Sequence, residues 1–250
     1  MTRTVRGVAL ALVCAAYPGG VTAQSLEDRV AGAPDGRVRF SFPARSDVCG
    51  DGRNIQFRSR GDGDWIPACD SGPARVVLRK SDGVITDIDT YVGGRWRSPG
   101  RDVTDLGTVT AGQAADYLLD LAETAETPAA RDAILPAMVA DTVRVWRRLA
   151  AIARNEARAK RTRKHAMHWL AMEASASLEE DDSADDPDRE ARERAVFALS
   201  QLRDDEAVPR LIEIARNHRY THVRRRALFW LGQSGDARAI DVLEHVLERR

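Results

Sequence analysis

Residues 192–215, RERAVFALSQLRDDEAVPRLIEIA, align without a gap with residues 224–247, RRRALFWLGQSGDARAIDVLEHVL, at an offset of 32 residues. Nine of the 24 aligned positions are identical. The identical pairs are Arg192/Arg224, Arg194/Arg226, Ala195/Ala227, Phe197/Phe229, Leu199/Leu231, Gln201/Gln233, Asp204/Asp236, Ala207/Ala239 and Leu211/Leu243. An internal repeat of this length is typical of a solenoid, in which stacked repeats complete one another's apolar core.

Each copy of the repeat predicts two helices, which we name A and B. Apolar residues recur at helical spacing in both, so each helix is expected to bury one face. In one copy these residues are Ala191, Ala195, Ala198, Leu199 and Leu202 for helix A, and Val208, Leu211, Ile212 and Ala215 for helix B. A third copy begins at Arg163, and the tetrapeptide IARN of 152–155 recurs at 214–217. We therefore predict an α-solenoid over residues 111–250.

The repeated segments resemble HEAT repeats, particularly the short bacterial type called PBS-lyase HEAT-like. The resemblance rests on ARERAVFALSQL with DDEAVPRLIEIA and on VRRRALFWLGQ with DARAIDVLEHVL, and it covers 189–249 and, in part, 141–175. HEAT arrays are typically interaction scaffolds, so the resemblance implies binding of a protein or peptide partner and no catalytic residue or cofactor. In such arrays the B helices usually line the concave face. The polar candidates there are Arg147, Arg154, Glu213, Arg216, Asp241, His245 and Glu248.

The third copy departs from the pattern because it has no B helix of its own. In its place residues 177–188 read SLEEDDSADDPD, with seven acidic side chains among residues 179–188. Dense like charge opposes a packed helix, so we predict a solvated acidic loop. Docking of a basic partner and Ca²⁺ binding are the alternatives. The run lacks the central Gly and terminal Glu of an EF-hand loop.

The first residues are typical of a secretory signal peptide. Arg3 and Arg6 precede the apolar run Val8–Ala16, and Val21-Thr22-Ala23 places small residues at a cleavage site. We predict a signal peptide over 1–23, cleavage after Ala23, a linker over 24–35 and a periplasmic or extracellular location. The run is shorter than the ~20 residues that span a bilayer, so no membrane span is expected after cleavage.

A small β-rich unit is predicted over 36–100. Val38 to Phe42 alternates apolar and polar residues, and Ser81-Asp82-Gly83 separates two β-branched runs as a hairpin turn does. Export removes Cys14 and leaves Cys49 and Cys69 in an oxidising compartment, where such a pair normally forms a disulfide. Free thiols are the alternative. The chain as a whole is thus an α+β protein in two parts.

Composition limits the function classes. The 38 basic and 38 acidic side chains cancel, which argues against nucleic acid or an anionic membrane as a partner, although six cations lie in 154–164. Neither the pair His165/His168 nor the pair His218/His222 has an evident third metal ligand in sequence, so no metal is expected. We predict an exported, non-enzymatic scaffold. The alternatives are a cell-envelope lyase or hydrolase with a site between the two units, and a glycan binder using Trp65 and Trp96.

Overall fold

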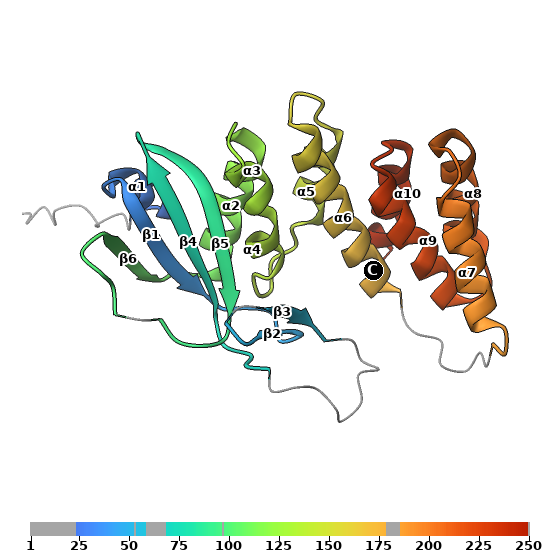
Figure 1. Ribbon diagram of the computed structural model, residues 1–250, viewed down its shortest axis with the longest axis horizontal. Coiled ribbons are helices and arrows are strands. Elements are labelled where there is room, and N and C mark those ends of the chain that lie inside the picture. The colour runs from blue at the N-terminus through green and yellow to red at the C-terminus, as the bar shows by residue number, and fades with distance from the viewer. Residues whose placement is uncertain (1–23, 53, 59–68, 97, 179–185, 250) are drawn as a thin grey trace, which may run out of the picture.

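The structure is a computed structural model that describes residues 24–249, apart from residues 53, 59–68, 97 and 179–185. A β region over residues 36–108 is followed by a run of consecutive helices over 111–248 that stack beside one another (Figure 1). This arrangement confirms the predicted α+β chain with a helical solenoid. None of the described helices is long and apolar enough to cross a bilayer.

The β region is built on a four-stranded sheet with strand order β5-β4-β1-β6, in which β1 pairs antiparallel with β4 and parallel with β6. The strands are β1 (Gly36–Phe42), β4 (Ala74–Ser81), β5 (Val84–Val92) and β6 (Val103–Thr108), and a separate ribbon joins β2 (Val48–Gly50) and β3 (Ile55–Phe57). The predicted hairpin is β4–β5. The sheet continues beyond the expected boundary at residue 100, because β6 pairs with β1.

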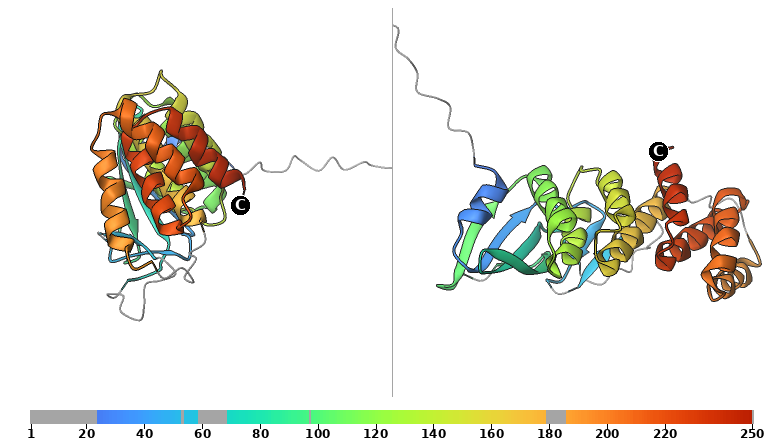
Figure 2. Two further views of the ribbon diagram at one scale, coloured as in Figure 1. Left: turned by 90° about the vertical axis from the view of Figure 1, so that its right-hand side faces the viewer. Right: turned by 90° about the horizontal axis from the view of Figure 1, so that it is seen from above.

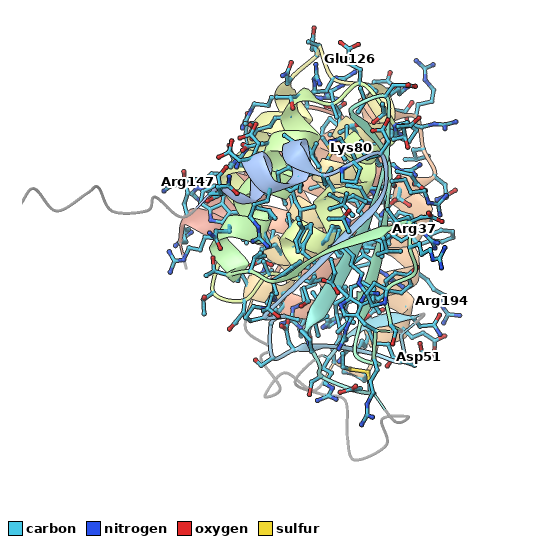
Figure 3. The ribbon with its side chains drawn as sticks, turned by 90° about the vertical axis from the view of Figure 1, so that its left-hand side faces the viewer. Arg37, Asp51, Lys80, Glu126, Arg147 and Arg194 are labelled. Atoms are coloured by element: carbon cyan, nitrogen blue, oxygen red, sulfur yellow. A yellow bond between two sulfur atoms is a disulfide. The ribbon has the colours of Figure 1, made fainter. Side chains whose placement is uncertain are left out.

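A disulfide joins Cys49 of β2 to Cys69, with 5.4 Å between their Cα atoms, and is the yellow bond in Figure 3. It closes a loop of the kind for which the chain-entropy model gives roughly 3 kcal/mol of stabilisation. The predicted pairing is therefore present in the fold. It fastens the small ribbon, which otherwise has few strands to hold it.

The predicted linker over 24–35 is wrong in part, because it contains the helix α1 (Leu26–Gly32). Ser25 caps its first turn, and Leu26 and Val30 are buried. The buried ammonium group of Lys80 donates hydrogen bonds to the carbonyl oxygens of Val30, Ala31 and Ala33 at 2.7–3.1 Å, at the end of the helix (Figure 3). The Ala33 N–H also donates to the Val30 carbonyl oxygen, but the last carbonyls of a helix mostly lack partners within it, and here the β4 side chain supplies them. The helix is too short for its periodicity to be recognised in the sequence.

The helical part begins against the sheet. Phe40 of the sheet meets Tyr117 of α2 with ring centroids 6.4 Å apart. The helices are α2 (Ala111–Thr124), α3 (Ala129–Asp132), α4 (Ile134–Met138), α5 (Trp146–Arg154), α6 (Lys160–Ser177), α7 (Arg189–Ser200), α8 (Asp204–Asn217), α9 (Thr221–Ser234) and α10 (Arg238–Glu248). By the repeat alignment, α6, α7 and α9 are A helices, and α5, α8 and α10 are B helices.

The repeats do not stack in chain order. α9 packs between α6 and α7, and α10 packs against α5, α6 and α8, so the pair α9–α10 stands between α6 and the pair α7–α8 (Figures 1 and 2). We call α6, α9 and α7 the A layer, and α5, α10 and α8 the B layer. The approach of α9 to α6 is close, since a Cβ atom on Gly232 would lie 2.3 Å from the Cβ atom of Ala171.

Two expectations about this part are corrected. Helix A of the copy at α7 was expected to bury Ala191, Ala195, Ala198 and Leu202, yet all four are exposed and Val196 is its buried residue. The acidic run was expected to be solvated throughout. Residues 179–185 lie outside the described residues, but the Asp186 side chain is only 1% exposed because Arg192 and His222 cover it.

Candidate binding surface on the B layer

A cavity of about 640 Å³ opens where α6 and α8 end beside α10. We call it the B-layer cavity. Its lining combines seven polar or charged residues with four apolar ones. The lining residues are Ser177, Leu178, Ala215, Arg216, Asn217, Arg224, Asp241, Val242, His245, Val246 and Arg249. The volume is within the range of ligand sites in proteins, and the lining is more polar than in most of them.

Positive charge predominates in the B-layer cavity. Arg216, Arg224 and Arg249 face a single acid, Asp241, whose carboxylate accepts a hydrogen bond from Arg154 at 2.6 Å. The same guanidinium binds Glu244 at 2.6 Å, and these two acids raise the pKa of Arg154 above its ordinary value. Since three arginines and one aspartate line the cavity, the lining has a surplus of positive charge.

The arginines differ in how firmly they are held. Arg224 donates to the carbonyl oxygen of His218 at 3.1 Å and to the Thr221 hydroxyl at 3.0 Å. Arg216 and Arg249 are exposed, and within the described part of the chain neither has an ion pair or side-chain hydrogen bond. These two side chains can therefore turn toward an anionic group without breaking a contact.

The structure brings together some of the predicted partner-binding residues. Arg216, Asp241 and His245 line the cavity, and Arg154 stands behind Asp241. Three others lie outside its lining. Arg147 packs over the ring of Trp146 at 5.1 Å, Glu213 accepts a hydrogen bond from Asn217, and Glu248 is exposed on α10.

Several lining residues could not be found from the sequence. Ser177 and Leu178 end α6, whereas Val242, Val246 and Arg249 belong to α10. Chain order placed these two helices two repeats apart. The position of Arg224 within a run of three arginines was visible, but nothing in the repeat indicated which neighbour it would meet.

The junction between the β region and the solenoid is formed by rings. Phe57 of β3 lies 5.3 Å from Trp169 of α6, whose indole N–H donates to His165 Nε2 at 3.1 Å. His168 Nδ1 and the Gln233 amide are 2.7 Å apart. Burial lowers the pKa of His165 to about 4 and also lowers that of His168, so both imidazoles are neutral at pH 7. The contact between Phe57 and Trp169 packs β3 against α6, where the β region meets the solenoid.

No group of three metal-ligating side chains converges within the described residues. The side chains of His218 and His222 contact different partners. His222 Nε2 lies 3.3 Å from Asp186 Oδ2, and His218 Nδ1 accepts a hydrogen bond from the backbone N–H of Tyr220.

Of the two tryptophans predicted as alternative glycan-binding residues, the structure describes Trp96. Trp96 is half-buried on the outer face of the sheet, where the guanidinium group of Arg39 lies 4.6 Å from its ring centre. That stacking covers part of the ring a sugar would use. Trp65 lies outside the described residues.

Two of the arginines at the starts of the A helices have acidic side chains nearby. Arg192 binds Asp186 at 3.0 Å, and Arg226 lies 3.8 Å from Glu193 of the neighbouring A helix. In the basic stretch 154–164, Arg154 is paired with acids and Arg158 donates to the Ala125 carbonyl oxygen. These charges mainly join one helix to another.

Comparison with known proteins gives one finding. Residues 182–250 match a family model of HEAT repeats, which supports a HEAT-repeat protein. No curated protein and no solved structure matches the chain. HEAT repeats commonly mediate protein interactions and are generally non-enzymatic scaffolds.

Proposed function

We propose that this chain is an exported, non-enzymatic scaffold that binds a peptide segment of a protein partner in the B-layer cavity. The observation that carries the proposal is the cavity itself, which is lined by the cationic side chains of Arg216 and Arg249 together with four apolar residues. The HEAT repeats at its edge support a binding role. The short PBS-lyase HEAT-like type remains our assignment from the repeated motifs.

The chemistry of the cavity suits an extended segment with a carboxylate and an aliphatic side chain. Arg216 and Arg249 would meet the carboxylate, because guanidinium groups bind such anions through paired hydrogen bonds. Leu178, Val242 and Val246 would meet the aliphatic group. Arg154 would act indirectly, because its hydrogen bond fixes the position of the Asp241 carboxylate.

Two features support export. The N-terminal sequence has the basic start, apolar run and cleavage site of a signal peptide. The disulfide between Cys49 and Cys69 is of a kind that persists in oxidising compartments. Cleavage after Ala23 would leave Ser25 to cap α1 and Leu26 to pack in the core.

The binding proposal is tested by comparing partner recovery from a bacterial envelope extract. We expect a protein retained by the wild-type chain to be lost with the double variant Arg216→Glu, Arg249→Glu. The matched control is Arg147→Glu, which reverses an exposed charge of the B layer outside the cavity. Equal recovery by all three chains would contradict the proposal.

The export proposal is tested by N-terminal sequencing. We expect the chain produced in a bacterial host with its native start to be found in the periplasm or medium and to begin at Gln24. A chain that keeps Met1 and stays in the cytoplasm would contradict export.

A further inference from the structure

The face of α7 that the repeat pattern marks as apolar is left uncovered. Ala191, Ala195 and Ala198 are exposed, and Leu202, just beyond the helix, is 38% exposed. These four residues lie in one stripe at helical spacing. We call this stripe the open face of α7.

Two positions of this stripe, Ala191 and Ala195, and the neighbouring position of Leu199 correspond to buried residues in both related A helices, whereas the counterparts of Ala198 and Leu202 are half-buried. The counterparts of Ala191, Ala195 and Leu199 are Val223, Ala227 and Leu231 in α9, and Thr162, Ala166 and Leu170 in α6. All six are at most 3% exposed. The A-helix pattern thus occurs three times, and these positions are buried in two of the three helices.

A B helix covers this face in the two covered cases. α6 packs against α5, and α9 packs against α8, which in each case is the B helix immediately before it in the chain. In α9, Gly232 faces Ala171 of α6, and Trp230 faces Phe197 of α7 at 5.3 Å. The side that carries Ala227 is therefore left for α8.

Within the described residues no B helix precedes α7, and in the sequence the acidic run of residues 177–188 occupies that position. Asp186 fixes the end of this segment to the start of α7 through Arg192 at 3.0 Å. The B helices α5, α8 and α10 are all packed at other positions in the B layer. Within the described part of the chain, no helix is left over to cover the open face.

We propose that the open face of α7 binds an amphipathic helix of a partner protein, which packs there as a further B helix. Such a helix would continue the established packing of α5 on α6 and of α8 on α9. It would lie at the far end of the solenoid, beside α8 and remote from the β region (Figure 1). Helix-in-groove binding of this type reads apolar anchors spaced by three and four residues.

The small side chains on the open face of α7 determine which side chains the partner helix needs. Three of its four residues are alanines, so the partner must bring the larger aliphatic side chains, as Leu149 and Ile152 do in α5. A second copy of α7 would place alanine against alanine and bury little apolar surface. The exposed rim is nearly neutral, since Glu190 and Arg194 lie 3.6 Å apart and pair with each other. Apolar fit therefore governs recognition.

The probe that tests this inference is a synthetic peptide with the sequence of α8, residues 204–217. It is added to the ¹⁵N-labelled full chain, and amide chemical shifts are followed up to about 1 mM peptide, the range in which weak complexes saturate. We expect shifts confined to α7 and the adjoining edge of α8. A peptide carrying Leu211→Asp is the matched control and is expected to produce none.

Two variants of the chain sharpen the test. Ala195→Arg and Ala198→Glu each change an exposed residue, so both chains should fold, and each should weaken peptide binding at least about tenfold. Arg216→Glu in the B-layer cavity should leave it unchanged, which separates this site from the proposed peptide cavity.

Three results would overturn the inference. The first is the absence of shifts in α7 at the highest peptide concentration. The second is a shift pattern centred on Ala227 of α9, which would mean that the peptide replaces α8 itself. The third is self-association of the chain that Ala195→Arg abolishes in sedimentation, because a second copy would then occupy the open face.

Discussion

The pair α7–α8 and the pair α9–α10 share nine identical positions, yet α7 and α9 lie in different surroundings. α9 lies inside the A layer, where its apolar face is buried, whereas α7 lies at the end of the layer with that face in solvent. Identity of sequence therefore does not give identity of environment. A pair of identical residues shows what the neighbouring helices contribute, because the side chain is the same and only its surroundings differ.

The largest expected difference is for Ala227→Arg against Ala195→Arg. Ala227 is fully buried, so an arginine there would bring an unpaired charge into the core and cost roughly 3–5 kcal/mol of unfolding free energy. At exposed Ala195 the same change should stay within about 0.5 kcal/mol. Urea unfolding of both variants measures this, and equal losses would show that α7 is not at an open end.

A second pair compares Leu231→Ala with Leu199→Ala. Leu231 is fully buried, and its truncation should cost roughly 2–5 kcal/mol through lost burial and a residual cavity. Leu199 is only partly buried, so its truncation should cost about 1 kcal/mol. Thermal unfolding followed by circular dichroism should rank the midpoints wild type, Leu199→Ala, Leu231→Ala. The reverse ranking of the two variants would refute the difference in covering.

A third pair compares the small residues Gly232 and Ser200, which are counterparts in the repeat. Gly232→Ala should cost roughly 1–3 kcal/mol, because the added Cβ atom would collide with the Cβ atom of Ala171. Ser200→Ala should change the unfolding free energy by at most about 0.5 kcal/mol. If Gly232→Ala is instead stabilising, as alanine is in an open helix, α9 does not approach α6 closely.

The smallest effect depends on pH. Arg224 of α9 binds neutral oxygens, whereas its counterpart Arg192 binds the carboxylate of Asp186. Burial by itself would raise the pKa of Asp186, but hydrogen bonds from Arg192 and the Asp188 N–H bring it below its ordinary value.

Since the folded pKa of Asp186 is below the unfolded one, its ionised form stabilises the fold above about pH 3.9, and that stabilisation is lost as pH falls through the folded value. The difference in unfolding free energy between wild type and Asp186→Asn should thus be larger at pH 6 than at pH 3. A difference independent of pH would show that the carboxylate charge contributes nothing.

The repeated residues predicted the helices themselves, because side-chain periodicity determines which face of a helix is apolar. The pairing of Cys49 and Cys69 followed from their number and the expected compartment. The order of the repeats in space could not be predicted, since the copies resemble each other and any A helix could pack beside any other. Residues of the B-layer cavity such as Leu178 and Val246 depend on that order, and so they were missed.

Helix α1 was missed for a different reason. Its seven residues give too short a pattern to recognise, and part of its stabilisation comes from Lys80, which lies about fifty residues further along the chain. Long-range hydrogen bonds of this kind leave no local signal in the sequence. The exposure of Ala195 was unpredictable in the same sense, because it depends on which helices lie beside α7 in space.

The central place of α10 has a consequence for the order in which the helices come together. α10 buries Ile240, Leu243 and Leu247, and it packs against α5 and α6, which come several helices earlier in the chain. Contacts between segments that are far apart in the sequence form more slowly than contacts between neighbouring segments. The middle of the solenoid therefore depends on contacts that form late in folding, whereas the hairpin of α8 and α9 joins helices that follow one another in the sequence.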